Sequence, residues 1–114
     1  MQIDYLEIVS PDVDAVCACY EKLHGVQFSA PQAGLGNART AALANGGMIG
    51  VRAPMHVAEQ PVVRPYLLVE DIEAAAKAAE AAGAEIAHPP MELPGFGKFA
   101  IYIQGGIHHG LWQR

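Results

Sequence analysis

The residues Asp12-Val13-Asp14-Ala15 recur as Asp71-Ile72-Glu73-Ala74, at an offset of 59 between positions 12 and 71. The same offset relates Asn45-Gly46-Gly47-Met48 to Gln104-Gly105-Gly106-Ile107. A solenoid needs about three or more repeats to bury a continuous core, and this chain has only two copies. The pattern therefore predicts a duplicated half-domain whose copies pair, with any binding site between equivalent surfaces.

Length and composition bound the class of protein. With 114 residues, 52% of them hydrophobic and 17% charged, the chain can form one compact domain with a modest core. We expect a single domain over residues 1–114, with modules at 1–55 and 62–114. The net charge of −5 argues against nucleic acid as a partner, because the few cations form no basic stripe to contact phosphates.

The sequence also argues against a membrane location. No apolar run approaches the roughly 20 residues that span a bilayer. The N-terminal residues 1–5 lack the basic start and apolar stretch of a signal peptide. We therefore expect a cytoplasmic protein without membrane contact.

The periodicity of apolar residues predicts the same order of elements in both halves. Residues 2–9 alternate as a strand, Ser10-Pro11 is typical of a helix start, and Gly25 and Gly83 are placed as helix ends. The helices are marked by apolar residues at helical spacing: Val13, Val16, Cys17, Tyr20 and Leu23, then Ile72, Ala75, Ala76, Ala79 and Ala82. Further strands are expected at 26–30, 38–44, 48–53, 63–69, 84–88, 98–103 and 107–113. This order, strand-helix-strand-strand-strand twice over, is typical of an α+β fold.

Two glycine-containing loops bear on function. The loop expected at Pro89–Gly97 is long and apolar, and we predict that it folds over a pocket. The pairs Gly34/Gly36 and Gly95/Gly97 do not lie between a strand and a helix, so they do not indicate a nucleotide-binding loop.

The most characteristic stretches of the chain are Ile3–Ile8 followed by Ser10-Pro11-Asp12, Tyr66–Ile72, Pro94–Ala100 and Gly110–Gln113. They resemble the vicinal oxygen chelate superfamily, which includes glyoxalase I, extradiol dioxygenases and bleomycin-resistance proteins. The likeness covers nearly the whole chain and is more specific in the second half. It implies two βαβββ modules whose curled mixed sheets pair around a cavity, and a homodimer that completes or covers it.

In metal-dependent members of that superfamily, four residues in the cavity bind a divalent ion. The resemblance places these positions at Tyr5, Gly50, Arg64 and Gly110. The glycines offer no donor group, arginine is a cation, and a neutral tyrosine is a poor ligand. We therefore expect no metal and no other cofactor, and we expect the two glycines to leave room for a ligand.

Alternation along the strands extends these positions to a set that faces the expected cavity, since residues i and i±2 share a face. As ligand-binding residues we predict Tyr5, Met48, Arg52, Arg64, Tyr66 and Trp112, and as catalytic candidates Glu7 and His108. Each has a structural alternative: Glu7 could neutralise Arg52 or Arg64, the aromatic residues could belong to the core, and His108 could be exposed.

Three functions remain open at this point. The favoured one is a metal-free small-molecule binding protein of the glyoxalase/bleomycin-resistance type. A second is a metal-independent lyase or isomerase that uses Glu7 or His108 as acid or base. The third is a noncatalytic dimeric accessory module. Two arginines against one glutamate on the predicted cavity face indicate an anionic ligand, although the sequence does not name it.

Overall fold

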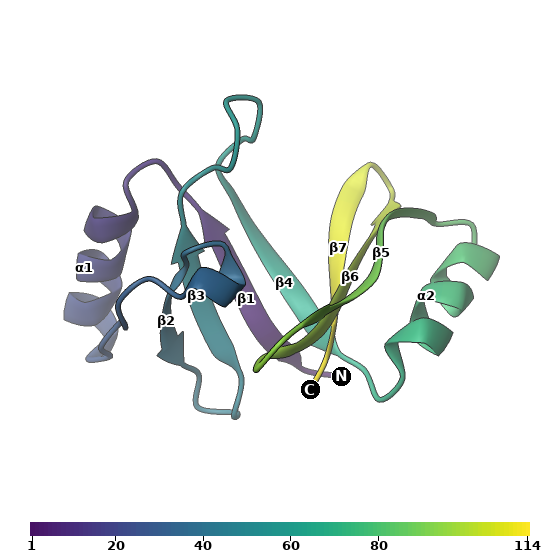
Figure 1. Cartoon of the computed structure of the whole chain (residues 1–114), viewed down its shortest axis with the longest axis horizontal. Helices are drawn as coiled ribbons and strands as arrows, with labels where there is room; N and C mark the ends of the chain where they lie inside the picture. Colours follow the sequence, from purple (N-terminus) through teal and green to yellow (C-terminus); the bar gives the residue numbers. More distant parts are fainter. The chain divides into compact units, whose positions relative to one another are not determined.

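The computed structural model describes all 114 residues and divides them into two compact units (Figure 1). Tyr5–Val63 form the first module, and Arg64–Arg114 together with Met1–Asp4 form the second. The elements in chain order are β1 (Ile3–Val9), α1 (Val13–His24), a short 3-10 helix (Ala33–Leu35), β2 (Arg39–Ala42), β3 (Met48–Arg52), β4 (Val62–Leu68), α2 (Ile72–Ala81), β5 (Glu85–Leu93), β6 (Gly97–Gln104) and β7 (Ile107–Gln113). The predicted α+β class is confirmed. Neither helix has the length and hydropathy that a membrane crossing requires.

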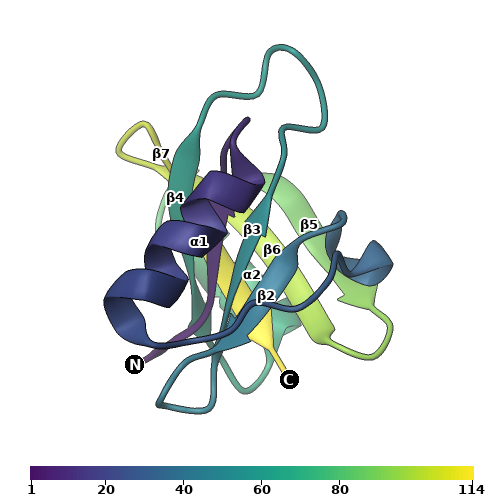
Figure 2. The same cartoon turned by 90° about the vertical axis from the view of Figure 1, so that its left-hand side faces the viewer.

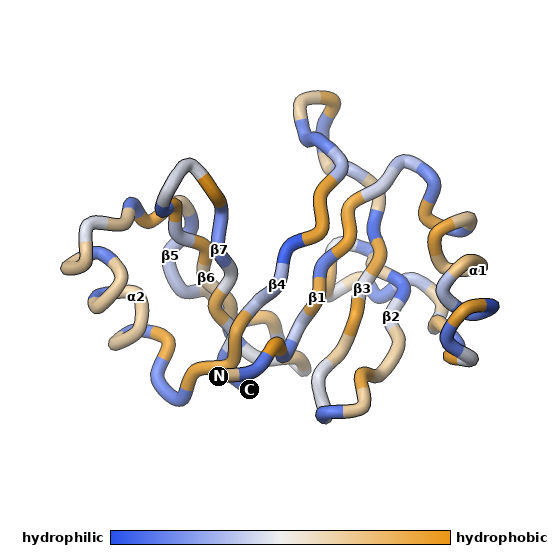
Figure 3. The backbone as a smooth tube through the Cα atoms, turned by 180° about the vertical axis from the view of Figure 1, so that it is seen from behind, coloured by the Kyte–Doolittle hydropathy of each residue, from blue (hydrophilic) through white to orange (hydrophobic).

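The first module is a three-stranded sheet with α1 packed on one face (Figure 2). Strand β3 lies in the middle, parallel to β1 and antiparallel to β2. Side chains from alternate strand positions and from α1 form its core: Ile8, Cys17, Phe28, Ala41, Ile49 and Val51. Four of the five residues of the predicted stripe, Val13, Val16, Cys17 and Tyr20, therefore pack in this core, whereas Leu23 is 71% exposed. Figure 3 shows the alternation of hydrophilic and hydrophobic segments along this helix.

Helix α1 ends at the glycine that the sequence predicts but starts at a different cap residue. Gly25 ends the helix in the left-handed region, with φ of 66°, and its N–H donates to the Glu21 carbonyl. At the start, the N-cap is Asp12 rather than the predicted Ser10. The Ser10 hydroxyl instead accepts a hydrogen bond from the Asp12 N–H at 3.0 Å, so it fixes the turn before the helix.

The second module is a four-stranded sheet in the order β4-β7-β6-β5. Strands β4 and β7 are parallel, and β6 is antiparallel to both of its neighbours. Asp71 is the N-cap of helix α2, and its side chain accepts a hydrogen bond from the Ala74 N–H at 3.1 Å. Its contacts with the sheet bury Ile72 against Ala100 and Leu111.

Two expectations about local structure were wrong. Residues 26–30 do not form a strand, because the Phe28 N–H is bound to the Glu21 carboxylate at 2.9 Å. The expected flap at Pro89–Gly97 does not exist, because Pro89–Leu93 continue strand β5 and pair with β6 up to Leu93↔Gly97. The two prolines are tolerated there since β5 is an edge strand and needs no outward N–H groups.

The edge strands β5 and β2 are each protected against pairing with a further strand. Register shifts on either side of His88, together with Pro89 and Pro90, interrupt the outer edge of β5. Strand β2 has only four residues, and its Thr40 carbonyl is already bound by the Ser29 N–H at 2.8 Å. Short, interrupted or occupied edges resist pairing with a further strand.

Candidate functional site

The predicted site residues lie on the face of each sheet that is turned away from that module's helix, here called its distal face. In the first module the distal face carries Tyr5, Glu7, Met48, Gly50 and Arg52, since β1 and β3 pair as Tyr5↔Met48 and Glu7↔Gly50. In the second module alternation gives Arg64, Tyr66, His108, Gly110 and Trp112. The predicted assignment of faces within each module therefore agrees with the observed registers.

Arg52 is the centre of a buried ion-pair cluster on the first distal face. Its Nε donates to Glu7 at 2.9 Å, and its two terminal nitrogens donate to both carboxylate oxygens of Glu59 at 2.9 and 2.8 Å. The Arg52 side chain is 7% exposed and that of Glu7 10%. The structural alternative, in which Glu7 neutralises Arg52, is confirmed.

Glu59 was missed by the sequence reasoning, although it is the only acid in the loop from Pro54 to Pro61. It also accepts the Met55 N–H at 2.7 Å, so it closes that loop onto Arg52. The hydrogen bonds from Arg52 hold the pKa of Glu59 at about 2, against an ordinary value of 4.5. Arg52 thus faces two carboxylates on the first distal face.

The second distal face is aromatic. The Tyr66 ring meets Trp112 edge to face at 6.0 Å between centroids and Phe99 at 6.3 Å. Tyr66 and Trp112 are buried, whereas Phe99, Ile101 and Ile103 on β6 are half-buried. These three alternate residues pair with Trp112, Gly110 and His108 on β7, so they share its distal face. Sequence alternation within 98–103 could have found them.

The candidate bases differ in their surroundings. Glu7 is bound to Arg52, and the His108 side chain is exposed next to the β6–β7 turn. The adjacent His109 stacks on Tyr102 at 5.0 Å and contacts the Gln104 carbonyl. The catalytic roles of Glu7 and His108 stay predictions.

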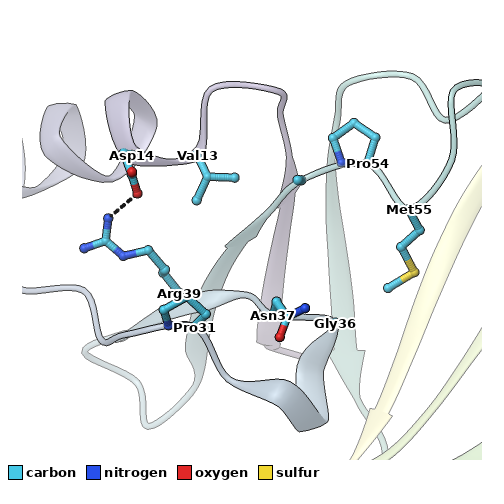
Figure 4. A pocket seen from close by; sticks show the side chains of 9 residues that line it. Val13, Asp14, Pro31, Gly36, Asn37, Arg39, Pro54 and Met55 are labelled. Carbon is cyan, nitrogen blue, oxygen red and sulfur yellow. Dashed lines mark hydrogen bonds and ion pairs between the residues drawn. The ribbon is translucent and has the colours of Figure 1, made fainter.

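A separate pocket of about 380 Å³ lies in the first module, between the start of α1, the Pro31–Asn37 segment and Ala53–Met55 (Figure 4). At one side of it, Arg39 is paired with Asp14 at 2.9 Å. None of the predicted site residues lines this pocket.

Comparison with known proteins identifies the fold. No protein-family model and no curated protein matches the chain. Among solved structures, a hypothetical protein from Bacillus halodurans C-125 is similar with a TM-score of 0.79 and 11% identity, over 99% of this chain and 94% of that one. Methylmalonyl-CoA epimerase from Mycobacterium tuberculosis gives a TM-score of 0.76 and 16% identity, over 97% and 86%. A variant of the Streptomyces coelicolor epimerase, in complex with 2-nitronate-propionyl-CoA, gives 0.73 and 16%, over 99% and 94%.

The chain has the vicinal oxygen chelate fold. The resemblance seen in the sequence is thereby confirmed at the level of the fold. At these identities the likeness shows the fold and leaves the chemistry to the residues of this chain.

Two of the positions that the resemblance assigns to metal ligands, Gly50 and Gly110, are closely approached by tyrosine rings. A Cβ on Gly50 would stand 2.7 Å from Cζ of Tyr5 and closer still to its hydroxyl. A Cβ on Gly110 would stand 2.5 Å from Cγ of Tyr66. The expectation that these glycines leave room for a ligand was therefore wrong. Burial, and then the nearby charge of Glu7, raise the pKa of Tyr5, so its hydroxyl keeps its proton.

Gly50→Ala should lower the free energy of unfolding by about 1–3 kcal/mol, the scale of an overpacked core position. The cause is the collision between the new methyl group and the Tyr5 ring. Urea unfolding measures the loss. In the Tyr5→Leu background the same substitution should cost clearly less, and an equal cost in both backgrounds would contradict the proposed contact.

Glu59→Gln should destabilise the protein at pH 7 by about 1–3 kcal/mol, since it removes charge-assisted hydrogen bonds to Arg52. The native pKa of Glu59 lies below its ordinary value, so the stabilisation is present above pH 4.5 and is lost as the pH falls towards 2. Stability measured across this window should therefore fall less in the variant than in the parent.

Glu80→Gln, at an exposed position on α2, is the matched control. It should leave the acid dependence of stability unchanged. If the Glu59 variant follows the parent curve throughout the window, the ion-pair cluster does not contribute as described.

Proposed function

We propose that this protein binds a small, partly apolar molecule on the distal face of its second module and needs no metal to do so. The observation that carries the proposal is the half-buried row Phe99, Ile101 and Ile103, backed by the buried rings of Tyr66 and Trp112. Aromatic and aliphatic walls with a few polar groups are typical of small-molecule sites. Arg64, two residues from Tyr66 on the same face of β4, is proposed to contact an anionic group of the ligand.

The arrangement of polar groups favours binding over acid–base catalysis. A general base must be able to approach the proton that it removes. Glu7 is held by Arg52 at 2.9 Å, and Glu59 is held by the same guanidinium. The charges of the first distal face are thus used to stabilise the fold.

Phe99→Ala should weaken the binding of a flat aromatic probe such as 2-naphthoate about tenfold, the scale of one lost aromatic contact with its buried area. Calorimetry measures the affinity, and amide shifts in NMR spectra locate the probe. The affected amides should lie in β6 and β7. The affinity should survive exhaustive dialysis against EDTA, because no metal takes part.

Tyr102→Leu is the control for this experiment, since Tyr102 lies on the same strand and packs towards α2. It should leave the affinity unchanged. Equal losses in the two variants, or shifts confined to the first module, would refute the site, and loss of binding after chelation would refute metal independence.

An isomerase or lyase with Glu7 or His108 as base is the alternative. Similarity to methylmalonyl-CoA epimerases makes methylmalonyl-CoA the natural test compound. We expect that this protein does not exchange deuterium into methylmalonyl-CoA in D2O, because Glu7 is bound to Arg52 and is not available as a base. Exchange that disappears in Glu7→Gln or His108→Gln would establish catalysis and displace the binding proposal.

We further propose a homodimer with twofold symmetry. The protected outer edges of β2 and β5 make edge-to-edge pairing unfavourable, so the contact should use other surfaces. Exposed apolar side chains, Met55 and Val57 among them, are available for such a contact. Light scattering should give the mass of a dimer at micromolar concentration, and the mass of a monomer would contradict the proposal.

A further inference from the structure

The pocket of the first module has walls that are mainly apolar. Pro31, Pro54 and Val13 line it, and the Met55 side chain closes one side against Gly36. Its volume of about 380 Å³ lies within the range of about 300–1,000 Å³ that small-molecule sites occupy. The pocket lies entirely within one module, on elements that carry none of the predicted site residues.

The guanidinium of Arg39, at the side of this pocket, is held in place but has one nitrogen without a hydrogen bond. The Nε of Arg39 donates to the Ser29 carbonyl at 3.0 Å, which holds the guanidinium in place. Its Nη1 donates to Asp14 at 2.9 Å, and its Nη2 has no hydrogen-bond partner in the protein. The Arg39 side chain is 23% exposed, so its charge acts in a partly desolvated setting.

The ion pair between Asp14 and Arg39 is weak. The Asp14 side chain is 92% exposed, and exposed ion pairs contribute about 0–1 kcal/mol because water and salt screen them. A carboxylate that approached from inside the pocket could instead accept from both terminal nitrogens of Arg39, the stronger bidentate arrangement. Asn37, also at the pocket wall, has a side-chain amide without a protein partner.

We propose that this pocket binds a small organic monocarboxylate with an apolar body, whose carboxylate displaces Asp14 from Arg39. The apolar body contacts Val13 and the two prolines, and the Asn37 amide is available to a polar substituent. This site is independent of the one proposed on the second module.

The test titrates the 114-residue chain with hexanoate and with hexanamide, its neutral isostere, and follows amide shifts by NMR. Hexanoate should shift resonances of residues 13–14, 31–39 and 53–55, and hexanamide should not. Arg39→Gln should weaken hexanoate binding about tenfold or more, the scale of lost charge-assisted hydrogen bonds. Asp14→Asn should strengthen it about two- to fivefold, because the competing carboxylate is gone.

The Asp14 variant separates a binding site from a purely structural ion pair. If Asp14→Asn leaves the affinity for hexanoate unchanged, or if both probes shift the same resonances equally, the proposal is overturned. Phe99→Ala should leave hexanoate binding in the first module intact, so failure of one proposed site is distinguishable from failure of the other.

Discussion

The first module depends on the guanidinium of Arg52. This one group joins β3 to β1 through Glu7 and to the loop after β3 through Glu59. A buried charge is costly unless it is paired and hydrogen-bonded, and here the Arg52 side chain donates to two carboxylates and to the Ala53 carbonyl. Removing either carboxylate leaves part of that charge uncompensated. The cluster therefore holds both carboxylates, Glu7 and Glu59, in place on this face.

Two tyrosine–glycine contacts recur on the distal faces of the two modules. Tyr5 reaches diagonally from β1 to Gly50, whereas Tyr66 lies directly opposite Gly110 in the register of β4 and β7. In both modules the absence of a glycine side chain leaves the space that a tyrosine ring occupies. A residue with a donor side chain at either position would have to displace a buried ring.

Sequence periodicity was sufficient for features that depend on local spacing. The apolar stripes predicted both helices, and alternation assigned Tyr5, Glu7 and Arg52 to one face, as the register confirms. It failed where a distant partner decides the structure. Phe28 is bound by Glu21 in place of a strand neighbour, and Pro89–Leu93 extend β5 because β6 offers them partners. Glu59 could not be assigned to Arg52 from the sequence, since a loop acid has no periodicity.

The position of Phe99 supports the proposed binding site for a reason that goes beyond its aromatic character. Strand β6 is paired on both sides, by β5 and by β7, and its alternate residue Ala100 is buried against the core under α2. The backbone that carries Phe99, Ile101 and Ile103 is therefore held from two edges and one face. This part of the protein is already ordered before a ligand binds. Less of the interaction energy is therefore lost to conformational entropy. Placement on a central strand suits the half-buried row to the proposed binding role, whereas the same residues on an exposed loop would have to be ordered first.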